Sequence, residues 1–207
     1  CRSKIGRGTI RIINNPTFQS GLIFIFAASV LLCLTACAQN HQKQENMKRA
    51  IVVYFSATGT TESVARRLAA VTHADTMAIE PAQPYTSADL DWTNNHSRST
   101  LEMKNPKSHP AIKTPKKSLD AYDVVFIGYP IWWDLAPTVV NTFIESQHLD
   151  GKVVVPFATS GGSSINHSAA QLKKQYPNIK WREGKLLNAP SDKELTQWVE
   201  SLGIKAQ

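Results

Sequence analysis

Cysteine is nearly missing from this 207-residue sequence, because its three cysteines all lie within the first 37 residues. The rest of the chain therefore has no disulfide framework, no cysteine-ligated zinc site and no catalytic thiol. Histidines are scattered and none pairs at the i, i+4 spacing of a helical metal site, so we expect no bound metal. The patterns GxxxxGK(S/T), GxGxxG and GxSxG are also missing. Their absence argues against the usual nucleoside-triphosphate, dinucleotide and serine-hydrolase sites.

Acidic residues are missing from the start of the chain, and this accounts for much of its positive charge. The formal net charge is +7, but residues 1–36 contain four basic residues and no acid. The other 19 of the 23 basic residues stand against 16 acidic ones, and the one basic run among them is the short stretch 113–117. This distribution does not indicate a nucleic-acid-binding surface, so we expect no nucleic acid as a partner.

No apolar run reaches the roughly 20 residues that a membrane-spanning helix needs. The longest, Gly21–Leu34, follows a basic stretch, which is the organisation of a secretory signal peptide. The next residues, Leu34-Thr35-Ala36-Cys37, resemble the lipobox of bacterial lipoproteins. That resemblance implies that Cys37 carries a lipid and anchors the protein in the cell envelope, on the periplasmic side. We expect residues 1–36 to be the signal peptide and residues 37–47 a flexible tether.

Met47 offers an alternative start for the protein. It directly precedes the first strand-like run, where a cytoplasmic protein containing this domain would begin. Translation from Met47 would place the domain in the cytoplasm without a lipid anchor. The polar stretch Ala38–Asn46 has no periodic apolar face and indicates a flexible tether under either alternative.

Strand-like and helix-like segments alternate after residue 48. Three continuous apolar runs are typical of strands buried on both faces of a parallel sheet, and they lie at 50–55, 123–128 and 152–157. Weaker strands are expected at 76–80 and, as an edge, near 179–187. Helical periodicity is found at 61–71, 137–146, 163–175 and 192–202.

This alternation predicts an α/β domain over residues 48–207. Right-handed crossovers would build three layers around a doubly wound, five-stranded parallel sheet with the strand order 2-1-3-4-5. The segment 81–118 is rich in Pro, Ser, Asn, Thr and Lys and has no regular helical pattern. A loop of this length in a compact domain is usually either functional or disordered.

A loop of hydroxyl residues and one glycine follows the first strand. Residues 56–61 read Ser-Ala-Thr-Gly-Thr-Thr, and a helix is expected to begin at once. Free N–H groups and the helix dipole make such a loop an anion site, and Gly59 lets the backbone approach the anion closely. The loop has no lysine, which favours a monophosphate. A simple helix cap of serine and threonine is the alternative.

The loops after the third and fourth strands are expected at the same edge of the sheet. The first, Gly128–Asp134, contains Trp132 and Trp133, whose rings suit a flat, electron-poor ring of a ligand; packing into the next helix is the alternative. The second, Ala158–Ser164, has N–H groups that could face a polar edge of that ligand ring, or it is an ordinary glycine-rich turn. Tyr85 and Trp92 could cover the second face of the ligand ring or pack the 81–118 segment onto the domain.

These motifs resemble those of the flavodoxins. Val53–Thr61 looks like the flavodoxin FMN phosphate loop, and Ile127–Trp133 with Ala136-Pro137 is similar to a bacterial flavodoxin-like subgroup. The resemblance covers nearly all of 48–207 and implies a flavodoxin-like fold with non-covalently bound FMN as the cofactor. The cofactor-binding residues that it implies are Ser56, Ala57, Thr58, Gly59, Thr60, Thr61, Pro130, Ile131, Trp132, Trp133, Thr159, Ser160, Gly161 and Gly162.

Two features depart from the flavodoxin pattern. Asp134 stands where relatives often have glycine, and its carboxylate would disfavour negative charge on a reduced flavin. Small carrier flavodoxins are usually strongly acidic, which steers them to basic partners, whereas this domain is close to neutral. We therefore expect an FMN-dependent oxidoreductase linked to NAD(P)H or to a quinone, with no catalytic residue assigned. The alternative is a non-catalytic electron carrier that serves protein redox partners.

Overall fold

The computed structural model describes residues 49–204. The expected signal peptide, the lipid-bearing Cys37 and the expected tether lie outside the described residues. Within the described range, no helix is both long and apolar enough to cross a membrane.

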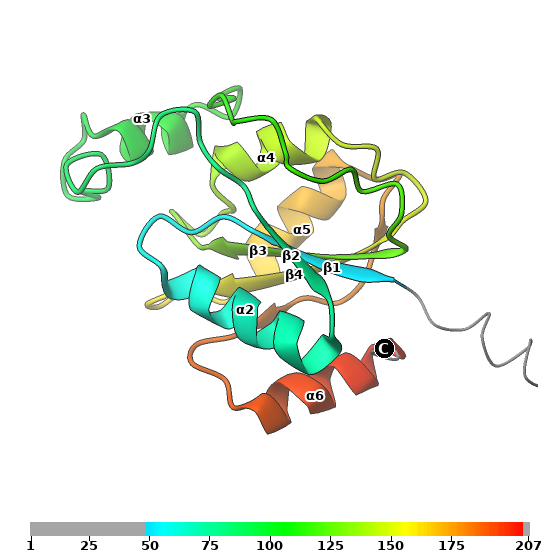
Figure 1. Ribbon diagram of the computed structural model, residues 1–207. Coiled ribbons are helices and arrows are strands. Elements are labelled where there is room, and N and C mark those ends of the chain that lie inside the picture. Colours follow the sequence, from blue (N-terminus) through cyan, green and yellow to red (C-terminus); the bar gives the residue numbers. More distant parts are fainter. Residues whose placement is uncertain (1–48, 205–207) are drawn as a thin grey trace, which may run out of the picture. The chain divides into compact units, whose positions relative to one another are not determined.

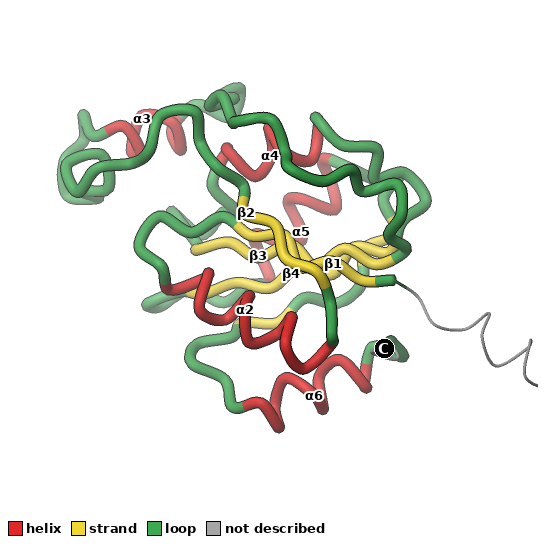
Figure 2. The backbone as a smooth tube through the Cα atoms, viewed as in Figure 1, coloured by secondary structure: helices red, strands yellow, loops and turns green. Residues whose placement is uncertain are grey.

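A parallel sheet forms the middle layer of the domain (Figures 1 and 2). Its strands run in the order β2-β1-β3-β4-β5, and the short β6 also pairs with β4. This arrangement confirms the predicted order 2-1-3-4-5, with the fifth strand divided into two pieces. The strands are β1 (Ala50–Tyr54), β2 (Asp75–Ala78), β3 (Val124–Pro130), β4 (Val153–Thr159), β5 (Lys180–Trp181) and β6 (Lys185–Leu186).

Helices cover both faces of the sheet and complete the three layers (Figure 1). Helices α2 (Thr60–Thr72) and α6 (Asp192–Ser201) pack on one face, and α4 (Thr138–Glu145) and α5 (Asn166–Gln175) pack on the other. The short α3 (Arg98–Lys104) belongs to the long segment between β2 and β3. The four longer helices begin within a few residues of their sequence predictions.

Strand β1 shows why a continuous apolar run marks a central strand. Successive side chains of a strand point to opposite faces of the sheet. Ile51 and Val53 therefore belong to the core under α4 and α5, while Val52 and Tyr54 belong to the core under α2 and α6. Because both faces are covered, each of these positions is buried and each has to be apolar or aromatic.

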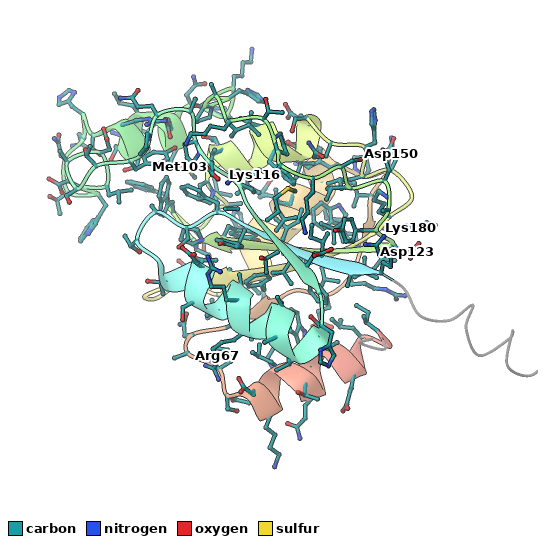
Figure 3. All side chains as sticks on the ribbon, viewed as in Figure 1. Arg67, Met103, Lys116, Asp123, Asp150 and Lys180 are labelled. Atoms are coloured by element: carbon teal, nitrogen blue, oxygen red, sulfur yellow. The ribbon has the colours of Figure 1, made fainter. Side chains whose placement is uncertain are left out.

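Helix α6 is fixed at its start by a reciprocal cap and by an ion pair. The Ser191 hydroxyl accepts a hydrogen bond from the Glu194 N–H, and the Glu194 carboxylate accepts one from the Ser191 N–H. Arg67 of α2, which Figure 3 labels, donates to the Asp192 carboxylate over 2.7 and 3.1 Å. Since this pair is largely exposed, it orients the two helices and adds little stability.

The edge strand is divided because it contains a bulge opposite Pro156. Val154 pairs with Trp181, but Phe157 pairs with Lys185, so the edge carries one extra residue between these points. Val154 and Ala158 accept hydrogen bonds from this edge, and Pro156 lies between them on the same side without an N–H to donate. The predicted continuous strand near 179–187 is therefore two short pieces.

The 81–118 segment is a loop whose two ends meet beside β2. Pro81 and Ile112 form an antiparallel bridge, the Ala82 N–H donates to the Ala111 carbonyl over 2.8 Å, and the Lys113 N–H donates to the Glu80 carbonyl over 2.8 Å. Apart from the seven residues of α3, the segment has no helix, as its composition predicts. Figure 2 shows it leaving β2, turning through the short helix α3 and returning past α4 toward the start of β3, mostly as a green loop.

Candidate functional site

A cavity of about 440 Å³ lies at the carboxyl ends of β1 and β3. This volume falls within the range of small-molecule sites, and the position is the one at which open α/β sheets bind ligands. The residues that line it are Ser56, Ala57, Thr58, Thr61, Leu90, Trp92, Ser99, Pro130, Ile131, Trp132 and Trp133. Two of the three predicted loops therefore reach the cavity directly, and neither contributes a charged side chain to its lining.

The first loop presents an open helix start to the cavity. Gly59 precedes α2 with a φ of 87°, and within the described part no side chain caps the first turn. The Ser56 hydroxyl is buried and finds no hydrogen-bond partner among residues 49–204. Gly59 and Thr60 are exposed at the rim and are not part of the lining. The loop thus offers N–H groups and an uncommitted hydroxyl to an anion.

Thr61 ties the first loop to the strand beside the second. Its hydroxyl is buried and lies 2.8 Å from the Thr159 hydroxyl at the end of β4. The Ile131 N–H donates to the Thr159 carbonyl over 2.9 Å. Thr159 is therefore a support that holds the phosphate loop and the tryptophan loop together, although it does not itself line the cavity.

The rest of the third predicted loop turns away from the lining. The Ser160 hydroxyl accepts hydrogen bonds from the N–H groups of Gly162 and Ser163. Asn188 holds the same turn, because its side chain accepts from the Ser160 N–H and donates to the Ser160 carbonyl. Gly161 and Gly162 belong to this self-contained turn, so their predicted contact with the flavin edge stays a prediction. The sequence carries no signal for the role of Asn188.

The second loop is a tight hairpin with its tip in a left-handed conformation. The backbones of Trp132 and Leu135 exchange hydrogen bonds of 3.0 and 2.9 Å around Trp133 and Asp134. These two residues have φ values of 46° and 63°, the pattern of a type I′ turn. Aspartate tolerates this conformation, but tryptophan is strained in it. The turn holds the Trp133 ring at the cavity, where the residue is 44% exposed.

The Trp132 ring packs against other aromatic side chains of the domain. Its ring makes edge contacts with Phe55 and Tyr85, at centroid distances of 5.6 and 5.3 Å, and those two rings also contact each other. Tyr85 therefore packs the 81–118 segment onto the domain, which is one of the two roles its sequence position allows. Trp92 differs, because it lines the cavity while being 76% exposed.

The 81–118 segment supplies a wall of the cavity through Leu90, Trp92 and Ser99. Neither Leu90 nor Ser99 is part of the predicted cofactor site. The Ser99 hydroxyl is buried and, within the part of the chain that the structure describes, has no hydrogen-bond partner. Leu90 and Ser99 belong to a stretch that resembles the same segment of the flavodoxin-like subgroup, but nothing in that stretch predicts contact with the site, because only the folded path of the segment brings them there.

A partly buried polar cluster holds this wall in place. Tyr85 donates to the Glu102 carboxylate over 2.5 Å, and Arg98 donates to the other oxygen of that carboxylate over 2.7 Å. The Arg98 guanidinium also lies over the Tyr85 ring, 4.1 Å from its centroid. Burial, with the Glu102 contact second, raises the pKa of Tyr85 far above its ordinary value, so its hydroxyl stays a donor. Met103 follows on α3 and lies toward α4 (Figure 3).

A second, basic pocket of about 530 Å³ adjoins the cavity and shares Ser56 with it. Lys113 and Lys116 both bind the Glu80 carboxylate, at 3.1 and 2.9 Å. The hydrogen bonds from Lys116 and Lys113 hold the pKa of that carboxyl below its ordinary value. Two lysines share one carboxylate here, which leaves positive charge in excess beside the cavity.

Comparison with known proteins agrees with this geometry. The family model described as flavodoxin matches residues 49–202. Two solved Bacteroides proteins, whose assignment as flavoproteins is provisional, are similar to this chain. The one from Bacteroides eggerthii is 57% identical, with a TM-score of 0.75, over 76% of this chain and 99% of its own. The one from Bacteroides uniformis is 47% identical, with a TM-score of 0.72, over 74% and 99%.

A more distant relative shares the fold alone. It is a flavoprotein from Lactobacillus acidophilus solved in complex with FMN, 18% identical, with a TM-score of 0.59, over 73% of this chain and 98% of its own. A search of the curated proteins gave no match. Because the family model spans the described domain almost from end to end, the chain belongs to the flavodoxin family.

Proposed function

We propose that the domain binds FMN non-covalently in the 440 Å³ cavity and transfers electrons as an FMN-dependent oxidoreductase. One observation carries this proposal. The uncapped start of α2 and a wall of tryptophan side chains line the same cavity, and no charged residue of the described range lines it. When bound, FMN would supply the redox chemistry. The residues of the chain would bind it, orient it and exclude water from one side of its ring.

The first loop fits the phosphate of FMN. The Ser56 hydroxyl, buried and without a partner in the described range, is available to hydrogen-bond a phosphate oxygen. Thr58 and the first-turn N–H groups of α2 add donors, and the helix dipole favours the negative charge. Glu62, the acid of the first turn, is engaged by Arg66 at 2.6 Å, which offsets its repulsion of a phosphate.

The second loop fits the flavin ring. Trp133 is held at the cavity by the hairpin turn, with Pro130 and Ile131 beside it. An aromatic face and apolar neighbours suit the flat isoalloxazine ring and keep water from it. We propose Trp133, more than the packed Trp132, as the tryptophan that contacts the ring. Trp92 faces the same cavity from the 81–118 segment.

The surroundings of the cavity support small-molecule redox partners. Trp92 and Trp133 line the cavity and are exposed, which suits an uncharged planar acceptor such as a quinone. The basic pocket beside the cavity suits the phosphates of NAD(P)H as donor. An electron carrier for protein partners remains the second candidate, because exposed aromatic residues around a site are also common in protein interfaces.

The expected signal peptide affects which molecule can donate electrons to the domain. A lipid on Cys37 would place the domain outside the cytoplasm, where nicotinamide cofactors are scarce. We propose in that case that membrane quinols supply the electrons. Processing of the chain that globomycin inhibits, together with loss of membrane attachment in Cys37→Ser, would support the lipid anchor. Wild type and Cys37→Ser that are both found in the soluble fraction would argue for translation from Met47.

One titration tests the central proposal. Purified full chain is mixed with FMN, and the visible spectrum, the flavin fluorescence and retention through gel filtration are recorded. Retained FMN that is released on heating supports the site; a protein that neither retains FMN nor quenches its fluorescence refutes it. Turnover of NADH, NADPH or a quinol with a quinone acceptor then separates an oxidoreductase from a carrier, which would show none.

Asp134→Gly is expected to stabilise the domain and to make bound FMN easier to reduce. Glycine is the residue preferred at the second position of a type I′ turn, so the free energy of unfolding should rise by up to about 1 kcal/mol. Removing the carboxylate beside the ring should raise the flavin midpoint potential on the order of 20–40 mV. Chemical denaturation and a redox titration measure the two effects.

Asp134→Asn is the matched control for this change. Asparagine keeps a side chain that tolerates the left-handed conformation but removes the charge. It should therefore reproduce the rise in potential without the gain in stability. A potential that stays the same in both variants would mean that Asp134 does not act on the flavin.

A further inference from the structure

Ser99 brings a buried polar group to the cavity from outside the three flavodoxin loops. The residue is 2% exposed, lines the cavity, and has a hydroxyl that finds no partner anywhere in residues 49–204. A buried hydroxyl without a partner costs free energy, so such a group usually serves a ligand or a water molecule. Ser56, which lines the same cavity from the 56–61 loop, is the comparable case.

The position of Ser99 is firmly set by its surroundings. Its N–H donates to the Asp89 carbonyl over 3.0 Å, and Ser97 caps the helix by accepting from the Thr100 N–H. Its neighbour Arg98 is bound to Glu102 in the Tyr85 cluster. The hydroxyl therefore belongs to a wall that is fixed before any ligand arrives, which favours specific binding.

We propose that the Ser99 hydroxyl hydrogen-bonds a polar atom of the flavin ring, so that the 81–118 segment is a fourth cofactor-binding loop. The inference rests on the proposed function, since it needs FMN in the cavity. Leu90 and Trp92 accompany Ser99, whereas the donors for a phosphate lie on the 56–61 loop. One polar group among apolar ones suits a ring that has an apolar end and an edge rich in heteroatoms.

Thr138 supplies a matched control within the same chain. Its hydroxyl is also buried and, in the described part, also lacks a partner. It lies in a different groove, shared with Met103, Asn141 and Ser168, which contains none of the residues predicted to bind the cofactor. Removing either hydroxyl should relieve a similar cost in the protein without FMN, but only the removal of the Ser99 hydroxyl should affect the flavin.

The test compares wild type, Ser99→Ala and Thr138→Val as purified full chains. For Ser99→Ala we expect FMN and riboflavin to bind about five- to tenfold more weakly, by the same factor, because the contact is with the ring they share. The visible bands of bound FMN should shift, and the Tm without flavin should stay the same or rise. Thr138→Val should keep the wild-type affinity and spectrum.

Three results would overturn the proposal, and they can be told apart. Wild-type affinity and an unshifted spectrum in Ser99→Ala would remove Ser99 from the flavin site while leaving FMN binding intact. A lower Tm of Ser99→Ala without flavin, together with an equal loss of FMN affinity in Thr138→Val, would mean that the Ser99 and Thr138 hydroxyls both stabilise the fold and that neither contacts the flavin. A wild-type protein that binds neither FMN nor riboflavin would overturn the proposed function together with this inference.

Discussion

Thr58→Asp is expected to weaken FMN binding by roughly a hundredfold or more. Thr58 lines the cavity within the phosphate loop, so a carboxylate there would face the phosphate at close range. The fold should tolerate the change, because Thr58 is exposed and its hydroxyl makes, among residues 49–204, a single long hydrogen-bond approach, 3.4 Å to the Thr60 hydroxyl. The free energy of unfolding without flavin should change by less than about 0.5 kcal/mol. Fluorescence titration and chemical denaturation measure the two quantities.

Riboflavin identifies the cause of this loss, because it has the ring of FMN without the phosphate. Its affinity for Thr58→Asp should fall far less than that of FMN, and added salt should restore part of the FMN binding. The neutral Thr58→Asn variant should lose less than tenfold for either ligand. Equal losses for FMN and riboflavin would move the phosphate away from residues 56–61.

The central part of the fold follows from local patterns in the sequence. Each inner strand is buried on both faces, so β1, β3 and β4 had to be continuous apolar runs, and these are the strands predicted most closely. The loop at 56–61 and the start of α2 beside it were also predictable, because Gly59 and its hydroxyl neighbours occupy consecutive positions. Such features depend on residues that are adjacent in the chain. That this loop binds a phosphate stays a prediction.

The edge strand and the long segment could not be predicted in detail, because they depend on distant contacts. The division of β5 from β6 reflects Pro156 on β4 and Gly184 opposite it, where an added Cβ would lie 2.8 Å from the proline ring. Ser99 reaches the cavity only because the Tyr85 cluster positions α3. No local periodicity, either within 81–118 or along 179–187, encodes these arrangements, since the partners lie far along the chain or on other elements.

Gly128→Ala is expected to destabilise the domain by about 3 kcal/mol or more, a large part of the 5–15 kcal/mol typical of a domain. Gly128 lies in β3 directly beside Phe157 of β4. A Cβ at Gly128 would stand 2.2 Å from one Phe157 ring atom and 2.5 and 2.8 Å from two others. Phe157 is fully buried, so its ring has no free space to move into.

The Gly128 and Phe157 pair also connects stability to the proposed cofactor site. β3 carries the tryptophan loop and β4 carries Thr159, so strands forced apart here would separate the supports of the cavity. Phe157→Leu should relieve the clash, and the double variant should be more stable than the sum of the two single changes predicts, by more than about 1 kcal/mol. Denaturation of all four proteins measures this coupling. Strictly additive effects would show that the sheet adapts to a Cβ at Gly128 without the Phe157 ring having to move.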